Sequence, residues 1–185
     1  GLYWPRLVDV DFDQIRRQWH DGAPVAALVF YRALMQAGDV APIDSLINVL
    51  RAKGMNPLPL FGASLKETET AAIIADFLVK ADVDVILNMT SFAVSDPSKM
   101  AGATNDDDQN TMRSVGPFGA VDAPVFQLVL ASNQTADWQA STAGMTARDL
   151  AMNVALPERD GRILTRASCF KQPLTKVPVT PATAA

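Results

Sequence analysis

The sequence predicts an α/β fold: a parallel sheet with helices on both faces, in a flavodoxin-like or other doubly wound arrangement. Two observations lead to this prediction. Apolar runs of strand length alternate along the chain with segments whose apolar residues recur at helical spacing. The first such run, residues 25–31, is continuously apolar, as is typical of a strand covered on both faces. Strand–helix alternation of this kind favours parallel strands joined by right-handed crossovers.

The first half of the chain defines its elements clearly. Residues 11–20 are expected to form a short amphipathic helix before the 25–31 strand. Pro42 suits the first turn of the next helix and Gly54 the position just after its end. The strand expected at 57–61 contains two prolines, which cannot donate to a ladder, so we place it at a sheet edge.

The second half is less regular. Thr146 and Asp149 form a cap pair that is expected to open a single helical turn, followed by a strand at 152–156. The other expected elements are a helix at 67–81, strands at 84–89 and 124–130, a short helix around Trp138, and a last strand or hairpin arm at 163–170.

We expect residues 1–171 to form a single α/β domain, excised from a longer protein. Residues 91–122 carry little periodic hydrophobicity and are too long for an ordinary connector, so they are expected to be a loop, lid or insertion. Residues 172–185 are rich in Pro, Thr and Ala and are typical of a linker.

Composition excludes several classes of function. The net charge is −4 and no Lys/Arg-rich run occurs, which argues against nucleic-acid binding. No apolar run approaches the roughly 20 residues that span a bilayer. Cys169 is the only cysteine and His20 the only histidine, so we predict neither a disulfide framework nor a metal site. A reducing cytoplasm is the expected compartment.

Tyr31 and Arg32 follow the first expected strand and are candidate substrate-binding residues. Arg32 can act as a forked donor to a ligand carboxylate beside the N-terminus of the next helix. The alternative is that Arg32 extends into solvent while Tyr31 packs. A nucleotide site is not expected, because Gly38-Asp39 fits neither G-x-G-x-x-G nor the Walker pattern.

Two asparagines are further candidates for substrate binding. Asn88 ends the third expected strand, at the same rim position that Arg32 occupies on its own strand, and Asn153 begins the 152–156 strand. Buried asparagines usually make structural hydrogen bonds, which is the alternative for each.

Glu158 and Asp160 are the candidate catalytic residues, Asp160 the weaker of the two. They follow the 152–156 strand, where open α/β sheets bind ligands. Such a pair can bind a hard cation or transfer protons. The alternative is an ordinary Asp-Gly turn in which Arg159 or Arg162 pairs with the acids.

Several segments, taken in order, resemble the large subunit of aerobic cobaltochelatase (CobN), a relative of the magnesium chelatase large subunit. These segments are residues 1–5, 27–33, 38–44, 54–61, 148–163 and 165–171. The resemblance implies a piece from the N-terminal third of a tetrapyrrole-binding subunit. Such a subunit inserts Co²⁺ into hydrogenobyrinic acid a,c-diamide on the way to cobalamin.

The resemblance also implies partners and roles. An AAA+ ATPase subunit and its companion subunit would use ATP and Mg²⁺, Co²⁺ would be a substrate, and no cofactor is expected on this piece, which alone should be inactive. The Pro-Glu-x-Asp-Gly match implies that Glu158 removes pyrrole protons or delivers metal, although Arg159 stands where the family more often has an apolar residue. Tyr31 and Arg32 would hold carboxylates or amides of the macrocycle. The alternatives are a magnesium chelatase acting on protoporphyrin IX, or a scaffold that docks the ATPase.

Overall fold

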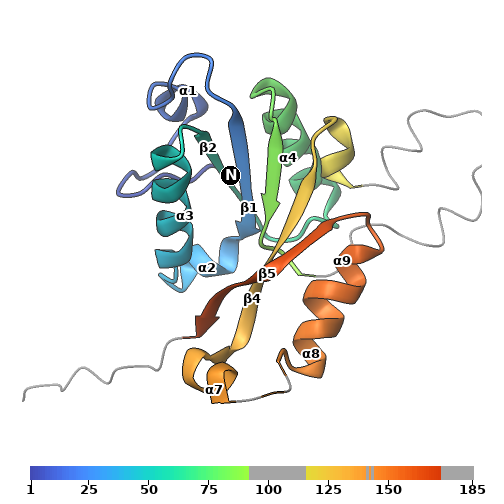
Figure 1. Ribbon diagram of the computed structural model, residues 1–185. Helices are drawn as coiled ribbons and strands as arrows, with labels where there is room; N and C mark the ends of the chain where they lie inside the picture. The colour runs from blue at the N-terminus through green and yellow to red at the C-terminus, as the bar shows by residue number, and fades with distance from the viewer. Residues whose placement is uncertain (92–115, 141, 143, 172–185) are drawn as a thin grey trace, which may run out of the picture.

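The computed structural model describes residues 1–91, 116–140, 142 and 144–171, and shows one five-stranded sheet (Figure 1). The strand order is β2-β1-β3-β4-β5, and every neighbouring pair is parallel. The strands are β1 (Val25–Tyr31), β2 (Asn56–Gly62), β3 (Val85–Asn88), β4 (Val125–Gln134) and β5 (Ile163–Lys171). This is the flavodoxin-like doubly wound order, so the predicted fold class is confirmed.

The helices follow the expected alternation over the first three strands. They are α1 (Phe12–Arg16), α2 (Arg32–Gln36), α3 (Ala41–Ala52), α4 (Thr68–Lys80), the 3-10 turn η1 (Pro117–Ala120), α7 (Thr135–Ala140) and the segments α8, η2 and α9 described below. The chain moves from β1 to β2 in one direction along the sheet and from β2 to β3 in the other. Right-handed crossovers therefore place α3 and α4 on opposite faces.

Strand β1 lies at the centre of the core. Its first six residues are buried, and Ala26 to Phe30 have no exposed surface, so the strand is covered on both faces. Phe30 packs edge-on against Tyr3, with ring centroids 5.9 Å apart. The continuous apolar run in the sequence reflects this two-sided burial.

Strand β2 forms one edge of the sheet, as its prolines predicted. Residues 1–3 lie along its outer side through an antiparallel bridge between Leu2 and Leu60. The Phe61 N–H donates outward, away from β1, to the Gly1 carbonyl. The backbone nitrogens of Pro57 and Pro59 point to the same outer side, because alternate residues of a strand face the same way. The missing donors of the two prolines therefore cost no bond to β1.

The predicted helix punctuation is largely confirmed. Pro42 lies in the first turn of α3, and Gly54 follows its end with a φ of +77°. Helix α4 matches the expected 67–81 helix closely. Most of the 91–122 loop and the whole 172–185 tail lie outside the described residues.

The prediction of a strand at 152–156 was wrong, because these residues are helical. Helix α8 (Ala147–Leu150), the π-helical turn η2 (Ala151–Ala155) and α9 (Leu156–Glu158) form one continuous helical segment, which Figure 1 shows beside β4 and β5. Thr146 does cap it, because its hydroxyl accepts from the Asp149 N–H at 3.0 Å. The buried stripe of this helix consists of Asp149, Asn153 and Pro157, four residues apart, so hydrophobic periodicity does not reveal it.

Candidate functional site

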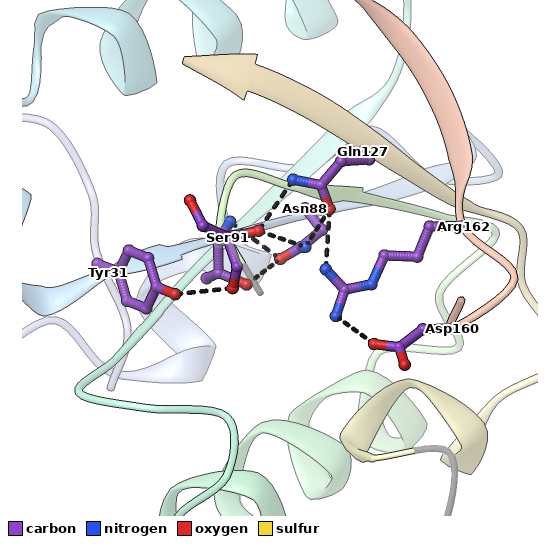
Figure 2. A network of polar contacts seen from close by, with 7 residues as sticks. Tyr31, Asn88, Ser91, Gln127, Asp160 and Arg162 are labelled. Atoms are coloured by element: carbon purple, nitrogen blue, oxygen red, sulfur yellow. Dashed lines mark hydrogen bonds and ion pairs between the residues drawn. The ribbon is translucent and has the colours of Figure 1, made fainter. Parts of the chain in front are cut away.

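The polar residues of the sheet gather at its topological switch point. From β1 the chain leaves toward β2 on one side, while β3 lies on the other, and ligands of open α/β sheets bind in the crevice outside the carboxyl ends at such a point. Tyr31 ends β1, and Asn88, Thr90 and Ser91 end β3 and begin the turn after it. Figure 2 shows the network of polar contacts around Tyr31, Asn88 and Ser91, which reaches Gln127 of β4 and the turn before β5.

Asn88 fixes the turn that follows β3. Its Nδ2 donates to the Thr90 carbonyl at 3.1 Å and to Gln127 Oε1 at 2.8 Å. Its Oδ1 accepts from the Thr90 N–H at 3.2 Å and from the Thr90 hydroxyl at 2.8 Å. Asn88 and Gln127 have no exposed surface, so every one of these bonds is shielded from water.

Gln127 connects this turn to Arg162, which lies next to the edge strand β5. It pairs with Asn88 in the β3–β4 register, and its Nε2 donates to the Thr90 carbonyl at 2.9 Å. Its Oε1 accepts from Asn88 and also from Arg162 Nη1 at 2.8 Å. The Gln127 amide is therefore held from both ends.

Arg162 places a buried positive charge at the end of the network. Its side chain is 1% exposed, and its Nη2 contacts Asp160 Oδ2 at 2.9 Å. Its guanidinium carbon lies 5.5 Å from the centre of the Phe118 ring, which covers it. Burial lowers the pKa of Arg162, and the Asp160 carboxylate opposes that shift.

Tyr31 and Asn153 form a second part of the network, and both bond to Ser91. The Tyr31 hydroxyl donates to the Ser91 carbonyl at 2.9 Å, and the Ser91 hydroxyl donates to Asn153 Oδ1 at 2.8 Å. Asn153 lies in the π-helical turn η2, and turns of this kind are frequent at functional sites. Because its Oδ1 faces Ser91, its amide NH₂ points away from that residue.

The structure joins some of the candidates and separates others. Tyr31 and Asn153 both bond Ser91, and Asn88 and Asp160 are linked through Gln127 and Arg162. The two sets of hydrogen bonds meet at the adjacent residues Thr90 and Ser91. Arg32 does not lie level with Asn88 as expected, since Asn88 pairs with Val29. Arg32 is instead the exposed first residue of α2, and the Arg32 side chain makes none of the contacts described above.

The two candidate acids lie in different environments. Asp160 forms an ion pair with Arg162. This agrees with the alternative given for it, an Asp-Gly turn in which a neighbouring arginine pairs with the acid. Glu158 does not end a strand: it is the exposed last residue of α9. The proposed roles of both residues in catalysis remain predictions.

Sequence reasoning missed Gln127, Thr90 and Ser91, and considered Arg162 only as a possible turn partner. A signal for two of the network residues was present. Gln127 interrupts the apolar run Pro124 to Leu130, and Asn88 interrupts the run Val85 to Met89. A lone buried amide in a strand needs an internal partner, and two such amides on neighbouring strands can supply one another.

Burial raises the pKa of the Tyr31 hydroxyl above its ordinary value of about 10, and the Arg162 charge partly opposes the shift. Burial and the Asp44 carboxylate raise the pKa of Tyr3, the other tyrosine of the chain. A raised folded pKa means that the native state holds its phenol protons at a pH where the unfolded chain releases them.

An alkaline titration of the chain tests this environment. Absorbance of tyrosinate at ~295 nm should stay low through pH 10, where free phenols are half ionised. Stability should be constant with respect to these groups below about pH 10 and fall as pH rises further, because the unfolded state then binds fewer protons. In Tyr31→Phe, Tyr3 is the remaining tyrosine, and its raised pKa should still delay ionisation beyond pH 10. Half-ionisation of the folded protein at pH 10 would contradict the assigned burial.

The site offers hydrogen-bonding and electrostatic recognition. Across residues 1–91 and the described parts of 116–171, no group of three or more His, Cys, Asp or Glu side chains lies close enough to hold a metal ion. Within the same residues, no helix combines the length and apolar character needed to cross a membrane. Fold and site together define an open α/β domain with a network of polar side chains at its β1/β3 switch point.

A family model described as CobN/Magnesium Chelatase matches residues 1–184, and the chain belongs to this family. Aerobic cobaltochelatase subunit CobN of Sinorhizobium sp is 43% identical over 148 residues, or 80% of this chain. The same subunit of Pseudomonas aeruginosa is 39% identical over 171 residues, or 92% of the chain. A magnesium-chelatase subunit of Rhodobacter capsulatus is 32% identical over 166 residues, or 87% of the chain.

A solved structure shares the fold. The catalytic subunit of cobaltochelatase from Mycobacterium tuberculosis superimposes with a TM-score of 0.66 over 81% of this chain, at 29% identity. The matched part is 12% of that chain, and 11% to 13% of the two CobN relatives and of the Rhodobacter protein. The chain therefore spans only about a tenth of the length of its relatives.

Proposed function

We propose that the chain is part of the large, tetrapyrrole-binding subunit of an ATP-dependent cobaltochelatase that inserts Co²⁺ into hydrogenobyrinic acid a,c-diamide. The observation that carries the choice of metal is the identity to relatives. Two CobN subunits match at 43% and 39%, whereas the magnesium-chelatase subunits of rice and Rhodobacter match at 30% and 32%. Metal insertion would be performed by the whole complex, and the chain alone is expected to be inactive.

In this proposal the switch-point network forms one wall of the macrocycle site. Hydrogenobyrinic acid a,c-diamide carries carboxyl and amide groups around its ring, and such groups are recognised by hydroxyl, amide and guanidinium donors. The Asn153 amide and the exposed Arg32 offer donors of this kind near the carboxyl ends of β1 and β3. Tyr31 and Asn88 would shape the wall rather than contact the ring through free donors, because their polar atoms bond within the protein.

Glu158 is the proposed proton acceptor. Inserting a divalent ion into a cobalt-free macrocycle requires loss of protons from its inner nitrogens, and a nearby carboxylate can accept them. Asp160 is less suited to this role because Arg162 holds it in an ion pair. Hydrolysis of ATP is assigned to the AAA+ partner and its companion subunit, which agrees with the lack of a phosphate-binding motif in the sequence.

Titrating the full-length subunit with each macrocycle tests the proposal. Tryptophan fluorescence should be quenched by cobalt-free hydrogenobyrinic acid a,c-diamide at concentrations at least about tenfold lower than by protoporphyrin IX, a difference of about 1.4 kcal/mol. Tighter binding of protoporphyrin IX would place the protein in the magnesium branch. Binding of neither macrocycle, with capture of the ATPase partner in a pull-down, would instead indicate a docking scaffold.

A further inference from the structure

Arg162 is a buried charge in the network to which the proposed chemistry gives no role. Its guanidinium is buried, is covered by Phe118, and has an Nε without a hydrogen-bond partner in the described structure. A buried ion pair is rarely the most stable way to fill such a space, since apolar residues of similar volume often do as well or better. Its presence is better explained by the orientation that it imposes on its neighbours.

The orientation imposed is that of two amides. A primary amide can be turned over with little change in shape, so a pair of buried amides has alternative hydrogen-bonding arrangements. Arg162 has donors only, and its Nη1 therefore requires the oxygen of Gln127 to face it. With Oε1 fixed there, Nε2 must face the Thr90 carbonyl, and the NH₂ group of Asn88 must face Gln127.

The same constraint then reaches the turn after β3. With its NH₂ toward Gln127, Asn88 presents Oδ1 to the N–H and hydroxyl of Thr90. Thr90 precedes Ser91, whose carbonyl accepts from Tyr31 and whose hydroxyl holds Asn153. Hydrogen bonds thus run from the Arg162 charge before β5, through Gln127 and Asn88, to the turn after β3 (Figure 2).

We propose that Arg162 is a positioning residue of the ligand site: through Gln127 and Asn88 it holds the Thr90–Ser91 turn so that Ser91 and Asn153 face the macrocycle. This inference rests on the proposed function for the identity of the ligand. Its first step, the ordering of the turn, is independent of any ligand.

Three variants of the full-length subunit test the proposal. Arg162→Met removes the donors, and Arg162→Lys keeps the charge but replaces the planar fork with a single ammonium. Asn56→Ala is the matched control. Asn56 is also buried and bonds His20 and Ala23, but it is the first residue of β2, at the opposite end of the strands from the network. Two quantities are measured, the affinity for cobalt-free hydrogenobyrinic acid a,c-diamide and the hydrogen exchange of the peptide containing residues 88–91.

Arg162→Met should weaken binding about tenfold and speed exchange at 88–91 by at least about tenfold, as expected for loss of one charged hydrogen bond. Arg162→Lys should fall between Met and wild type, and Asn56→Ala should change neither quantity. Unchanged affinity in Arg162→Met and Arg162→Lys would overturn the proposal, as would an equal loss in Asn56→Ala. If the wild-type subunit binds no corrinoid, the proposed function fails, and the exchange at 88–91 still decides whether Arg162 orders the turn.

Discussion

Replacing Glu158 by glutamine in the full-length subunit is expected to slow cobalt insertion by about a hundredfold or more, while corrinoid affinity changes little. The carboxylate is exposed at the end of α9, and the described residues give it no ion pair. We propose that this carboxylate accepts protons from a bound macrocycle. Glutamine has nearly the same shape but cannot accept a proton, and loss of a general base typically costs 10²–10⁴-fold in rate.

The measurement is the rate of Co²⁺ insertion by the complete complex, followed by the change in corrinoid absorbance. Glu69→Gln is the matched control, since Glu69 is also an exposed acid in a helix, the first turn of α4. Its insertion rate should equal that of the wild type. An unimpaired Glu158→Gln complex with normal assembly would remove Glu158 from the chemistry.

Replacing Asp160 by asparagine is expected to lower the free energy of unfolding of the chain by about 3 kcal/mol. Asp160 neutralises Arg162, whose side chain is 1% exposed, and removing one partner of a buried ion pair leaves an uncompensated charge. The double variant Asp160→Asn/Arg162→Met should be more stable than Asp160→Asn alone, because the unpaired charge is then gone as well.

Urea denaturation of the chain measures this difference. Asp21→Asn provides the control, because Asp21 is exposed and its replacement should change stability by less than about 0.5 kcal/mol. A loss below about 1 kcal/mol in Asp160→Asn, or a double variant less stable than Asp160→Asn, would show that the pair is effectively solvated.

The sequence was sufficient for the elements whose burial is apolar. The strand β1 is an uninterrupted apolar run because both of its faces are covered, and α3 begins and ends where Pro42 and Gly54 indicate. The edge position of β2 followed from its prolines, because an N–H pointing away from β1 can be lost without cost to the sheet.

The helix at 147–158 could not be recognised in the same way, since it buries polar residues. Asp149 accepts from Ser132 and Asn153 accepts from Ser91, so the contacts that hold this helix are hydrogen bonds to distant segments. Pro157 lies within this helical segment. In the structure the Leu156 N–H bonds to Ala151, five residues back, and the chain stays helical up to and through the proline.

The candidate site was predicted only in part, because its contacts join segments that are distant in the sequence. Local sequence identified residues at strand ends, such as Tyr31 and Asn88, but not the register that brings Arg162 against Gln127. That contact depends on the pairing of β4 with β5, which is set by the tertiary fold. Partners separated by 35 residues along the chain leave no periodic signal.

The covering of β2 by residues 1–3 limits how copies of this sheet can associate. Head-to-tail association of copies would pair the β2 edge of one sheet with the β5 edge of the next. Leu2 already bridges the β2 edge, and two prolines remove outward N–H donors from it. In the described structure β5 pairs only with β4. A β5 edge meeting another β5 edge generates a closed pair and no fibre.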